Sequence, residues 1–225
     1  QSKDIVNCCI DAADLVIAIG YDLVEYHPHL WNPDGDKKIL HIDFLPAEID
    51  KNYLPKVEIA GDIAHTLWSF NEELEGKKFD FDFSSQKTAR EEMTKEIAAH
   101  KDDDTEGSIR PQKLLWDIRE VLGPEDILLS DVGAHKMWIA RYYHCDAPNT
   151  CLISNGFCSM GFAFPGAIAA QRVNPDRHVI AVCGDGGFLM NVQEMETAKR
   201  LNSKIIVCVW EDKGYGLISW KQDNE

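Results

Sequence analysis

Several common features are missing from this chain of 225 residues, and each absence disfavours a class of function. No apolar run approaches the roughly 18 residues that a membrane-spanning helix needs, so we expect no membrane span. The N-terminal segment has no basic stretch, apolar stretch and cleavage site in succession, so no secretion is signalled. No Gly-x-Gly-x-x-Gly follows a predicted strand, which disfavours a nicotinamide-dependent dehydrogenase.

Positive charge is scarce. The chain has 23 Lys and Arg against 38 Asp and Glu, which gives a net charge of −15. Such a surface repels polyphosphate backbones, so we expect no nucleic-acid partner. A small phosphorylated ligand is compatible with this charge if a metal ion screens its phosphates.

Cysteine pairs with metal-site spacing are also missing. There are seven cysteines, an odd count, and none forms a Cys-x-x-Cys motif, which disfavours a disulfide framework or a zinc site. Cys183 and Cys208 lie in apolar runs and are predicted to be buried strand residues. The pattern is typical of a reduced, cytoplasmic setting.

The first part of the chain alternates short apolar strands with helices. Strands are predicted at 15–19, 38–43 and 57–61, and helices at 4–13 and 62–74, the second capped by Asp62. Strands without polar alternation that are separated by helices indicate a parallel sheet covered on both faces. There are fewer strands than such a sheet usually has, so residues 1–76 are predicted to be part of a domain.

Residues 77–107 are predicted to be a linker. They include Phe79, Phe81 and Phe83 among charged residues, a polar helix at about 85–100 and an acidic run at 102–104. The acidic run is typical of a solvated segment, with a metal site as the less favoured alternative.

Residues 108–225 are predicted to be a second α/β unit, a doubly wound parallel sheet with helices on both faces. The ligand of such a sheet binds beyond the carboxyl ends of its strands. The predicted strands are 127–131, 150–153, 178–183 and 204–210, and the predicted helices are 111–122, 133–143, 161–172 and 191–201.

Two aspartates follow two of these strands. Asp185 comes after the strand at 178–183, and Asp212 after the strand at 204–210. If the strands are neighbours, both carboxylates enter one crevice, where they repel each other unless a cation intervenes. Magnesium typically takes one or two carboxylates together with substrate phosphates and water, so the pattern predicts a magnesium site.

Glycines surround the first aspartate. Gly184, Gly186 and Gly187 leave backbone N–H groups uncovered ahead of the predicted helix at 191–201, whose N-terminus favours an anion. The combination with a metal site suits a diphosphate. A simple turn is the alternative for glycine next to aspartate when it stands alone.

This Gly-Asp-Gly segment, with Asp212 further along, resembles the signature of thiamine diphosphate-dependent enzymes, in particular the acetolactate synthases. The resemblance implies that Asp185, Asp212 and the backbone carbonyl of Gly214 bind Mg²⁺. Many members have Asn-Asn at the second position. The Glu211-Asp212 pair resembles the FAD-free, catabolic-type members, which leaves FAD binding open.

Three further segments resemble the same family. The segment at 131–138 implies that the stretch from Gly133 through Ala134 to His135 approaches the diphosphate. The segment at 154–165 implies that Cys158 offers its carbonyl to the aminopyrimidine. In the same segment, Met160 is implied to wedge between the two rings of the cofactor. The segment at 215–222, with Tyr215 and Leu217, implies a helix over the thiazolium. Read without the family, His135 is a surface residue, Met160 a core residue and the last segment the start of an amphipathic helix.

The resemblance covers nearly the whole chain and implies its domains, its reaction and its oligomeric state. Residues 1–76 resemble the C-terminal part of a Rossmann-like middle domain, and residues 108–225 the thiamine diphosphate domain, C-terminally incomplete. The implied reaction decarboxylates pyruvate and joins the product to a second 2-oxoacid, as in branched-chain amino acid biosynthesis. The implied enzyme is a homodimer or homotetramer.

The residue that activates the cofactor in this family is a glutamate on an N-terminal domain of a partner subunit. No such domain is found here, and Glu25 and Glu58 are not candidates. We therefore expect the chain to be the C-terminal portion of a longer enzyme, inactive alone. A 2-oxoacid decarboxylase, a pyruvate oxidase and a non-catalytic cofactor-binding module remain alternatives.

Overall fold

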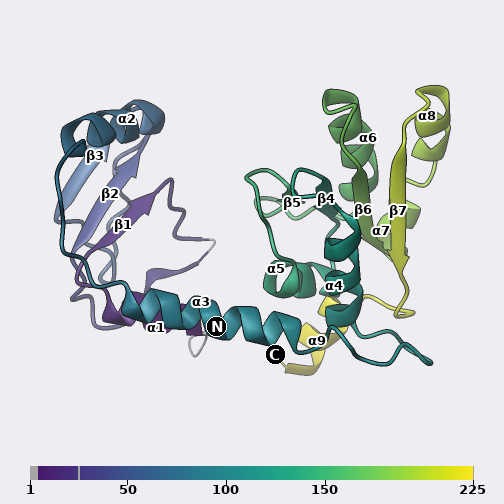
Figure 1. Cartoon of the computed structure of the whole chain (residues 1–225), viewed down its shortest axis with the longest axis horizontal. Coiled ribbons are helices and arrows are strands. Elements are labelled where there is room, and N and C mark those ends of the chain that lie inside the picture. Colours follow the sequence, from purple (N-terminus) through teal and green to yellow (C-terminus); the bar gives the residue numbers. More distant parts are fainter. Residues whose placement is uncertain (1–4, 25, 225) are drawn as a thin grey trace. The chain divides into compact units, whose positions relative to one another are not determined.

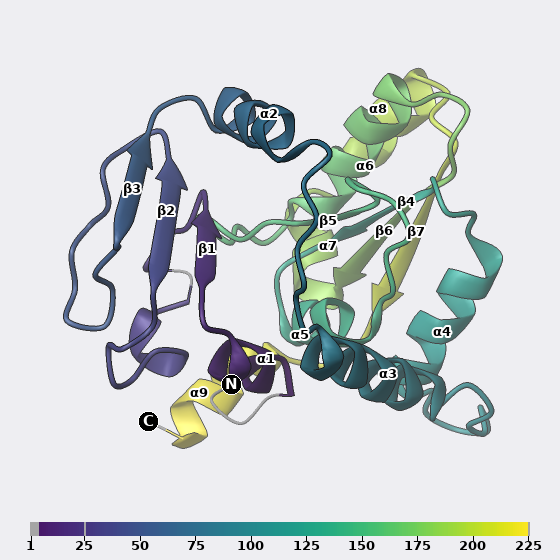
Figure 2. The same ribbon diagram turned by 60° about the vertical axis from the view of Figure 1, so that its left-hand side comes forward.

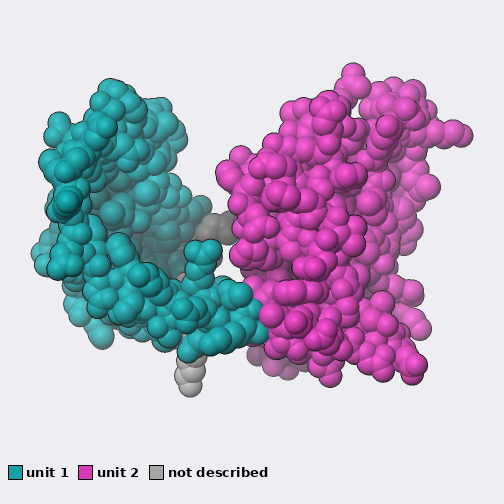
Figure 3. Space-filling view, in the orientation of Figure 1, with its two compact units in different colours: residues 1–95 teal, residues 96–225 magenta. Residues whose placement is uncertain are grey.

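The computed structural model describes residues 5–24 and 26–224, which belong to two compact units, residues 1–95 and 96–225 (Figure 3). The boundary falls within helix α3 (Ser84–Ala98), so the predicted linker at 77–107 contributes to both units. The limits predicted for the domains stay a prediction.

Among the helices of the described ranges, none has the length and apolar character that crossing a bilayer requires.

The first unit is built on a three-stranded parallel sheet in the order β1-β2-β3 (Figure 1). Val16 pairs with Ile39, and Leu40 pairs with Val57. The three predicted strands are confirmed, and Asp62 caps α2 as predicted, its side chain accepting from the His65 N–H at 2.7 Å. Asp4, at the start of the first predicted helix, lies outside the described residues. The elements of this unit are α1 (Ile5–Ala12), β1 (Val16–Ile19), the 3-10 helix η1 (Pro28–Leu30), β2 (Ile39–Asp43), β3 (Val57–Ala60) and α2 (Ile63–Leu74).

The second unit is built on a four-stranded parallel sheet in the order β5-β4-β6-β7 (Figure 2). The predicted α/β fold is confirmed, because helices pack on both faces of this sheet. The elements are α4 (Pro111–Val121), β4 (Ile127–Ser130), α5 (Ala134–Tyr142), β5 (Cys151–Ile153), α6 (Ala163–Val173), β6 (Val179–Gly184), α7 (Asp185–Met190), α8 (Glu194–Arg200), β7 (Ile205–Trp210) and α9 (Gly216–Asn224).

Successive residues of the central strands supply the two cores of this unit. Ala181 faces a cluster with α6 and α8, whereas Ile180 and Val182 face a cluster with α4 and α5. All three are buried, because in a strand alternate side chains point to opposite faces and here both faces are covered. The unbroken apolar runs in the sequence follow from this arrangement.

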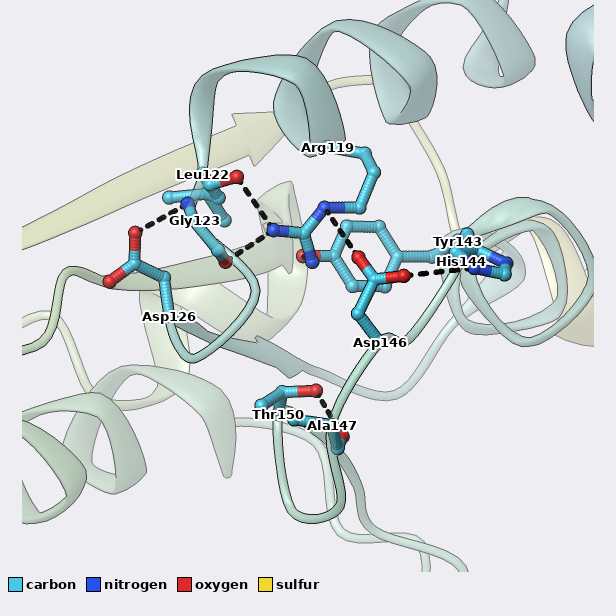
Figure 4. A network of polar contacts seen from close by, with 9 residues as sticks. All are labelled: Arg119, Leu122, Gly123, Asp126, Tyr143, His144, Asp146, Ala147 and Thr150. Carbon is cyan, nitrogen blue, oxygen red and sulfur yellow. Dashed lines mark hydrogen bonds and ion pairs between the residues drawn. The ribbon is translucent and has the colours of Figure 1, made fainter.

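The C-terminal end of α4 is held by the Arg119 guanidinium (Figure 4). It donates to the carbonyl of Leu122 at 2.6 Å, to the carbonyl of Gly123, and to the Tyr143 hydroxyl at 3.1 Å. A cation near the last turn satisfies carbonyls that have no partner within a helix. This contact joins α4 to the end of α5 and stabilises the face of the sheet that both helices cover.

One helix prediction is wrong in detail. The glycine-rich segment does not precede a helix at 191–201. Instead, Gly184 is the N-cap of the short helix α7, Gly186 and Gly187 lie in its first turn, and the later helix is limited to α8. The backbone N–H groups of these glycines therefore belong to the first turn of a helix rather than to a loop.

Candidate functional site

The strand order of the second unit places a crevice at one edge of its sheet. The chain passes from β4 to β5 on one side and then crosses to β6 and β7 on the other. Ligands of open α/β sheets bind outside the carboxyl ends of the strands at such a switch point. A cavity of about 460 Å³ lies there, lined by the segments that follow β4, β6 and β7.

Twelve of the thirteen residues predicted for the site line this one cavity. Cys158 is the exception. Its thiol lies 3.3 Å from Lys136 Nζ and 2.9 Å from the carbonyl oxygen of Asn155. The individual roles of the twelve as ligands stay predictions. The residues are Gly133, Ala134, His135, Met160, Gly184, Asp185, Gly186, Gly187, Asp212, Gly214, Tyr215 and Leu217.

Asp185 and Asp212 reach the cavity from neighbouring strands. β6 and β7 are parallel, and Gly184 pairs with Trp210, so the two aspartates follow paired strand ends. Asp185 Oδ1 accepts from the Gly186 N–H at 2.6 Å, and Asp212 Oδ1 accepts from the Gly214 N–H at 3.2 Å. Each carboxylate thus has one oxygen engaged in its own turn.

Few protein side chains near Asp185 and Asp212 could serve as further metal ligands. Within residues 5–24 and 26–224, no three His, Cys, Asp or Glu side chains gather as a candidate metal cluster. Two carboxylates and one backbone carbonyl are nevertheless a set that Mg²⁺ accepts when phosphate and water oxygens complete its octahedron. A magnesium site here would therefore depend on a phosphorylated ligand.

His135 is buried in the wall of the cavity, with 6% of its surface exposed. Burial lowers the pKa of His135 from its usual 6.5, partly opposed by the charges of Asp131 and Asp212 and by a hydrogen bond to the Asp131 backbone. The ring is therefore neutral at pH 7. Its Nε2 has no hydrogen-bond partner among the described residues, so this atom can accept from a ligand or, beside an anion, take up a proton.

Trp210 lies next to His135, with the two ring centroids 6.3 Å apart in an edge-on arrangement. Its indole N–H is also buried, and within the described part of the chain it has no acceptor. A buried polar atom without a partner costs free energy, so two such atoms in one cavity wall indicate that a polar ligand completes the site.

Close packing requires some of the glycines. A Cβ at Gly186 would lie 2.5 Å from Tyr215 Cε1 and 3.4 Å from Met160 Cε, and a Cβ at Gly133 would lie 2.9 Å from the His135 ring. These glycines therefore let the side chains of the cavity wall approach the backbone directly.

The sequence interpretation missed several residues of the cavity. Leu114, Trp138 and Trp210 line it, and so does Ile109 ahead of α4. Their apolar spacing was visible in the sequence, but it predicts core packing and does not distinguish a core from a cavity wall. Asp131 was also missed. It is a fully buried carboxylate directly after β4, for which the sequence offered no signal beyond its place at a strand end.

Comparison with known proteins agrees with this geometry. Residues 131–225 match the family described as "Thiamine pyrophosphate enzyme, C-terminal TPP binding domain", and residues 2–70 match "Thiamine pyrophosphate enzyme, central domain". The chain belongs to the thiamine pyrophosphate enzymes. The matched C-terminal segment begins at Asp131 and includes every predicted site residue.

Similar proteins are named as acetolactate synthases, which confirms the predicted resemblance. The chain is 38% identical over 219 residues to "Acetolactate synthase, catabolic" of Raoultella terrigena, covering 95% of this chain and 38% of that protein. It is 35% identical over 215 residues to "Acetolactate synthase" of Bacillus subtilis, covering 95% of this chain and 37% of that protein. With "Acetolactate synthase 1, chloroplastic" of Zea mays it shares 34% identity over 221 residues, covering 96% of this chain and 34% of that protein.

The chain thus spans little more than a third of the length of the curated relatives that it matches.

Proposed function

We propose that this chain is the cofactor-binding portion of a thiamine diphosphate-dependent carboligase of the acetolactate synthase type. The observation that supports this most directly is the single cavity at the switch point of the second sheet, which gathers twelve of the predicted site residues. The names of the relatives support pyruvate as the substrate.

The proposed binding mode assigns the diphosphate end of the cofactor to the three strand ends. Asp185, Asp212 and the Gly214 carbonyl would hold Mg²⁺, and the stretch from Gly133 to His135 would approach the diphosphate. The unpartnered Nε2 of His135 fits a polar group at this position. The thiamine ring system would lie between Met160 and the Tyr215–Leu217 segment, with the Cys158 carbonyl at its aminopyrimidine.

When bound, the cofactor supplies the electron sink for decarboxylation and carbon–carbon bond formation. The chain's own contribution is position and environment. Met160, Leu217 and Trp138 make part of the wall apolar, and an environment that excludes water favours the loss of a carboxylate charge. Holding a second 2-oxoacid beside the first would replace a bimolecular encounter, an effect that reaches about 7–11 kcal/mol in well-oriented reactions.

The cofactor also needs an activating group. The activating glutamate is expected on an N-terminal domain of a partner subunit in a homodimer or homotetramer, so we propose that the chain alone is inactive. FAD binding stays open. A cytoplasmic setting is proposed because the seven cysteines are odd in number and form no Cys-x-x-Cys motif, which suits a reducing compartment.

Titration calorimetry with thiamine diphosphate, with and without Mg²⁺, tests the binding proposal. We expect saturable binding that requires Mg²⁺, and no binding under either condition would contradict it. An assay of acetolactate formation from pyruvate by the 225-residue chain tests the second part, because robust turnover would contradict the proposed inactivity. Acetaldehyde or acetyl phosphate as the product of the complete enzyme would instead favour a decarboxylase or an oxidase.

A further inference from the structure

We propose that Asp131 is a positioning residue that sets the spacing between three walls of the cofactor cavity. The inference rests on the proposed function, because the cavity that it shapes is the one assigned to thiamine diphosphate. It concerns a side chain to which no ligand contact is assigned. Asp131 follows β4 directly, and its side chain is fully buried.

The Asp131 carboxylate accepts hydrogen bonds from three backbone N–H groups that belong to two segments. Oδ1 accepts from Val132 at 2.7 Å and from Gly161 at 2.8 Å, and Oδ2 accepts from Ala163 at 3.3 Å. The Val132 bond fixes the start of the turn that leads to Gly133 and His135. The bonds to Gly161 and Ala163 fix the segment that follows Met160 into α6.

A third segment packs against the same carboxylate. A Cβ at Gly187 would lie 3.1 Å from both Cγ and Oδ1 of Asp131, so the first turn of α7 rests on this side chain. The Cys183 thiol lies at the end of β6, where burial, together with the negative charge of Asp131, raises its pKa to about 12. One carboxylate therefore contacts the segments after β4, before α6 and after β6.

A carboxylate is the group that suits this position. Burying a charge is costly unless several hydrogen bonds compensate it, so a buried carboxylate is retained where its two acceptor oxygens are both used. An asparagine would keep one oxygen for Val132 and Gly161, but its NH₂ would face the Ala163 N–H, and two donors repel. A glutamate is one methylene longer and would press on the first turn of α7, where even a Cβ added at Gly187 would lie 3.1 Å from the Asp131 carboxylate.

The inference predicts a loss of cofactor affinity in addition to a loss of stability. If Asp131→Asn frees the segment around Gly161, only a fraction of molecules hold the binding-competent shape, and the apparent affinity is the intrinsic affinity multiplied by that fraction. We expect thiamine diphosphate in the presence of Mg²⁺ to bind about tenfold more weakly to this variant.

Asp126→Asn is the matched control, because Asp126 is a second buried carboxylate at the opposite end of β4. Its oxygens accept from the N–H groups of Gly123 at 2.7 Å and His178 at 2.8 Å, and it does not line the cavity. Titration calorimetry and thermal unfolding of both variants in the full chain form the experiment. Both variants should unfold at a lower temperature, and only Asp131→Asn should lose affinity. Unchanged affinity in Asp131→Asn, or an equal loss in Asp126→Asn, would overturn the inference.

Amide hydrogen exchange separates this inference from the proposed function. Exchange at Gly161 and Ala163 should rise in Asp131→Asn and stay unchanged in Asp126→Asn, whether or not cofactor is added. A parent chain that binds no cofactor would contradict the proposed function, while unchanged exchange at these amides would contradict the role of Asp131. If Asp131→Asn does not fold, Gly187→Ala displaces the same carboxylate more gently and should raise the same two exchange rates.

Discussion

Three aspartates lie at the carboxyl ends of strands in the second sheet, and their surroundings suit them to different roles. Asp131 is fully buried, and both of its oxygens accept from backbone amides. Asp185 and Asp212 line the cavity, and the hydrogen bonds to their own turns each use one oxygen. A carboxylate with saturated acceptors is suited to hold protein segments, whereas one with an oxygen toward a cavity is suited to bind a cation.

Replacing Asp185 by alanine should abolish Mg²⁺-dependent cofactor binding and leave the fold intact. A carboxylate at a strand end that lines a cavity adds little to the apolar core, but it is one of only two carboxylates in the proposed metal site. Titration calorimetry measures binding, and circular dichroism measures the fold. Glu194→Ala, in the first turn of α8, is the control and should bind like the parent. Unfolding of Asp185→Ala would indicate a structural role instead.

A Cβ at Gly186 would lie 2.5 Å from the ring of Tyr215, a side chain that is 56% exposed and can move aside. Gly186→Ala must displace Tyr215 from the cavity wall, and we expect weaker cofactor binding with little change in the free energy of unfolding. Urea denaturation and calorimetry measure the two effects.

Gly61→Ala is the control for that substitution. Gly61 lies in the first unit, outside the proposed site, and no described heavy atom lies within 4 Å of a Cβ there. We expect parent-like stability and affinity. Equal losses in the two variants would show that close packing of Tyr215 is not what selects glycine at position 186.

At the scale of single residues, the sequence located the side chains that directly follow predicted strands. Asp185 and Asp212 were recognised because each follows an apolar strand, and parallel neighbouring strands end at the same edge of a sheet. Asp131 follows a strand in the same way, but its burial depends on Gly161, Ala163 and Gly187, which reach it only through tertiary packing. Sequence position alone could not distinguish a buried carboxylate from a ligand.

At the scale of elements, the strands were predicted well and α7 was missed. Two glycines in a segment of six residues lower its intrinsic helix propensity by roughly 1 kcal/mol each relative to alanine. The helix forms because its side chains pack, with Phe188 against Phe164 at a centroid distance of 5.6 Å. Such contacts between segments far apart in the chain are not encoded in a local pattern.

The free energy of unfolding should depend on pH because of Asp126, which directly precedes β4. Burial would raise the pKa of Asp126, but hydrogen bonds from Gly123 and His178 outweigh it and hold this pKa below its usual 3.8. A depressed pKa stabilises the folded state above the unfolded value of 3.8, and this contribution is lost as pH falls through the folded value. Asp126→Asn should therefore cost about 2 kcal/mol at pH 7 and progressively less below pH 3.8.

Urea denaturation of the parent and of Asp126→Asn from pH 7 to pH 3 measures this difference. Asp176→Asn, an exposed aspartate in the turn before β6, is the control and should differ little from the parent throughout. A cost of Asp126→Asn that stays constant down to pH 3 would contradict the assignment of the pH dependence to this carboxylate.

At the scale of the whole molecule, the two units should respond differently to the cofactor. Every residue of the proposed site lies in the second unit, and each unit has its own sheet and core. A ligand stabilises only the state that binds it, by about 2.7 kcal/mol at a concentration 100 times its dissociation constant. Thiamine diphosphate with Mg²⁺ should therefore raise the unfolding temperature of the second unit alone.

Scanning calorimetry of the full chain, with and without cofactor, measures this effect. Hydrogen exchange assigns each transition to a unit, using amides of β2 for the first unit and of β6 for the second. Thiamine without its diphosphate is the control ligand and should shift neither transition. An equal shift of both units would contradict the confinement of the site to residues 96–225.

The proposed function depends on Asp185 and Asp212 holding one divalent ion that anchors a diphosphate. A crystal structure of the chain with thiamine diphosphate and Mg²⁺ tests it most directly. We expect one octahedral ion with a carboxylate oxygen of each aspartate and the Gly214 carbonyl at about 2.1 Å, and diphosphate oxygens among the remaining ligands. A bound cofactor whose metal ion lacks either carboxylate, or a cofactor that lies outside this cavity, would rule out the proposed magnesium site.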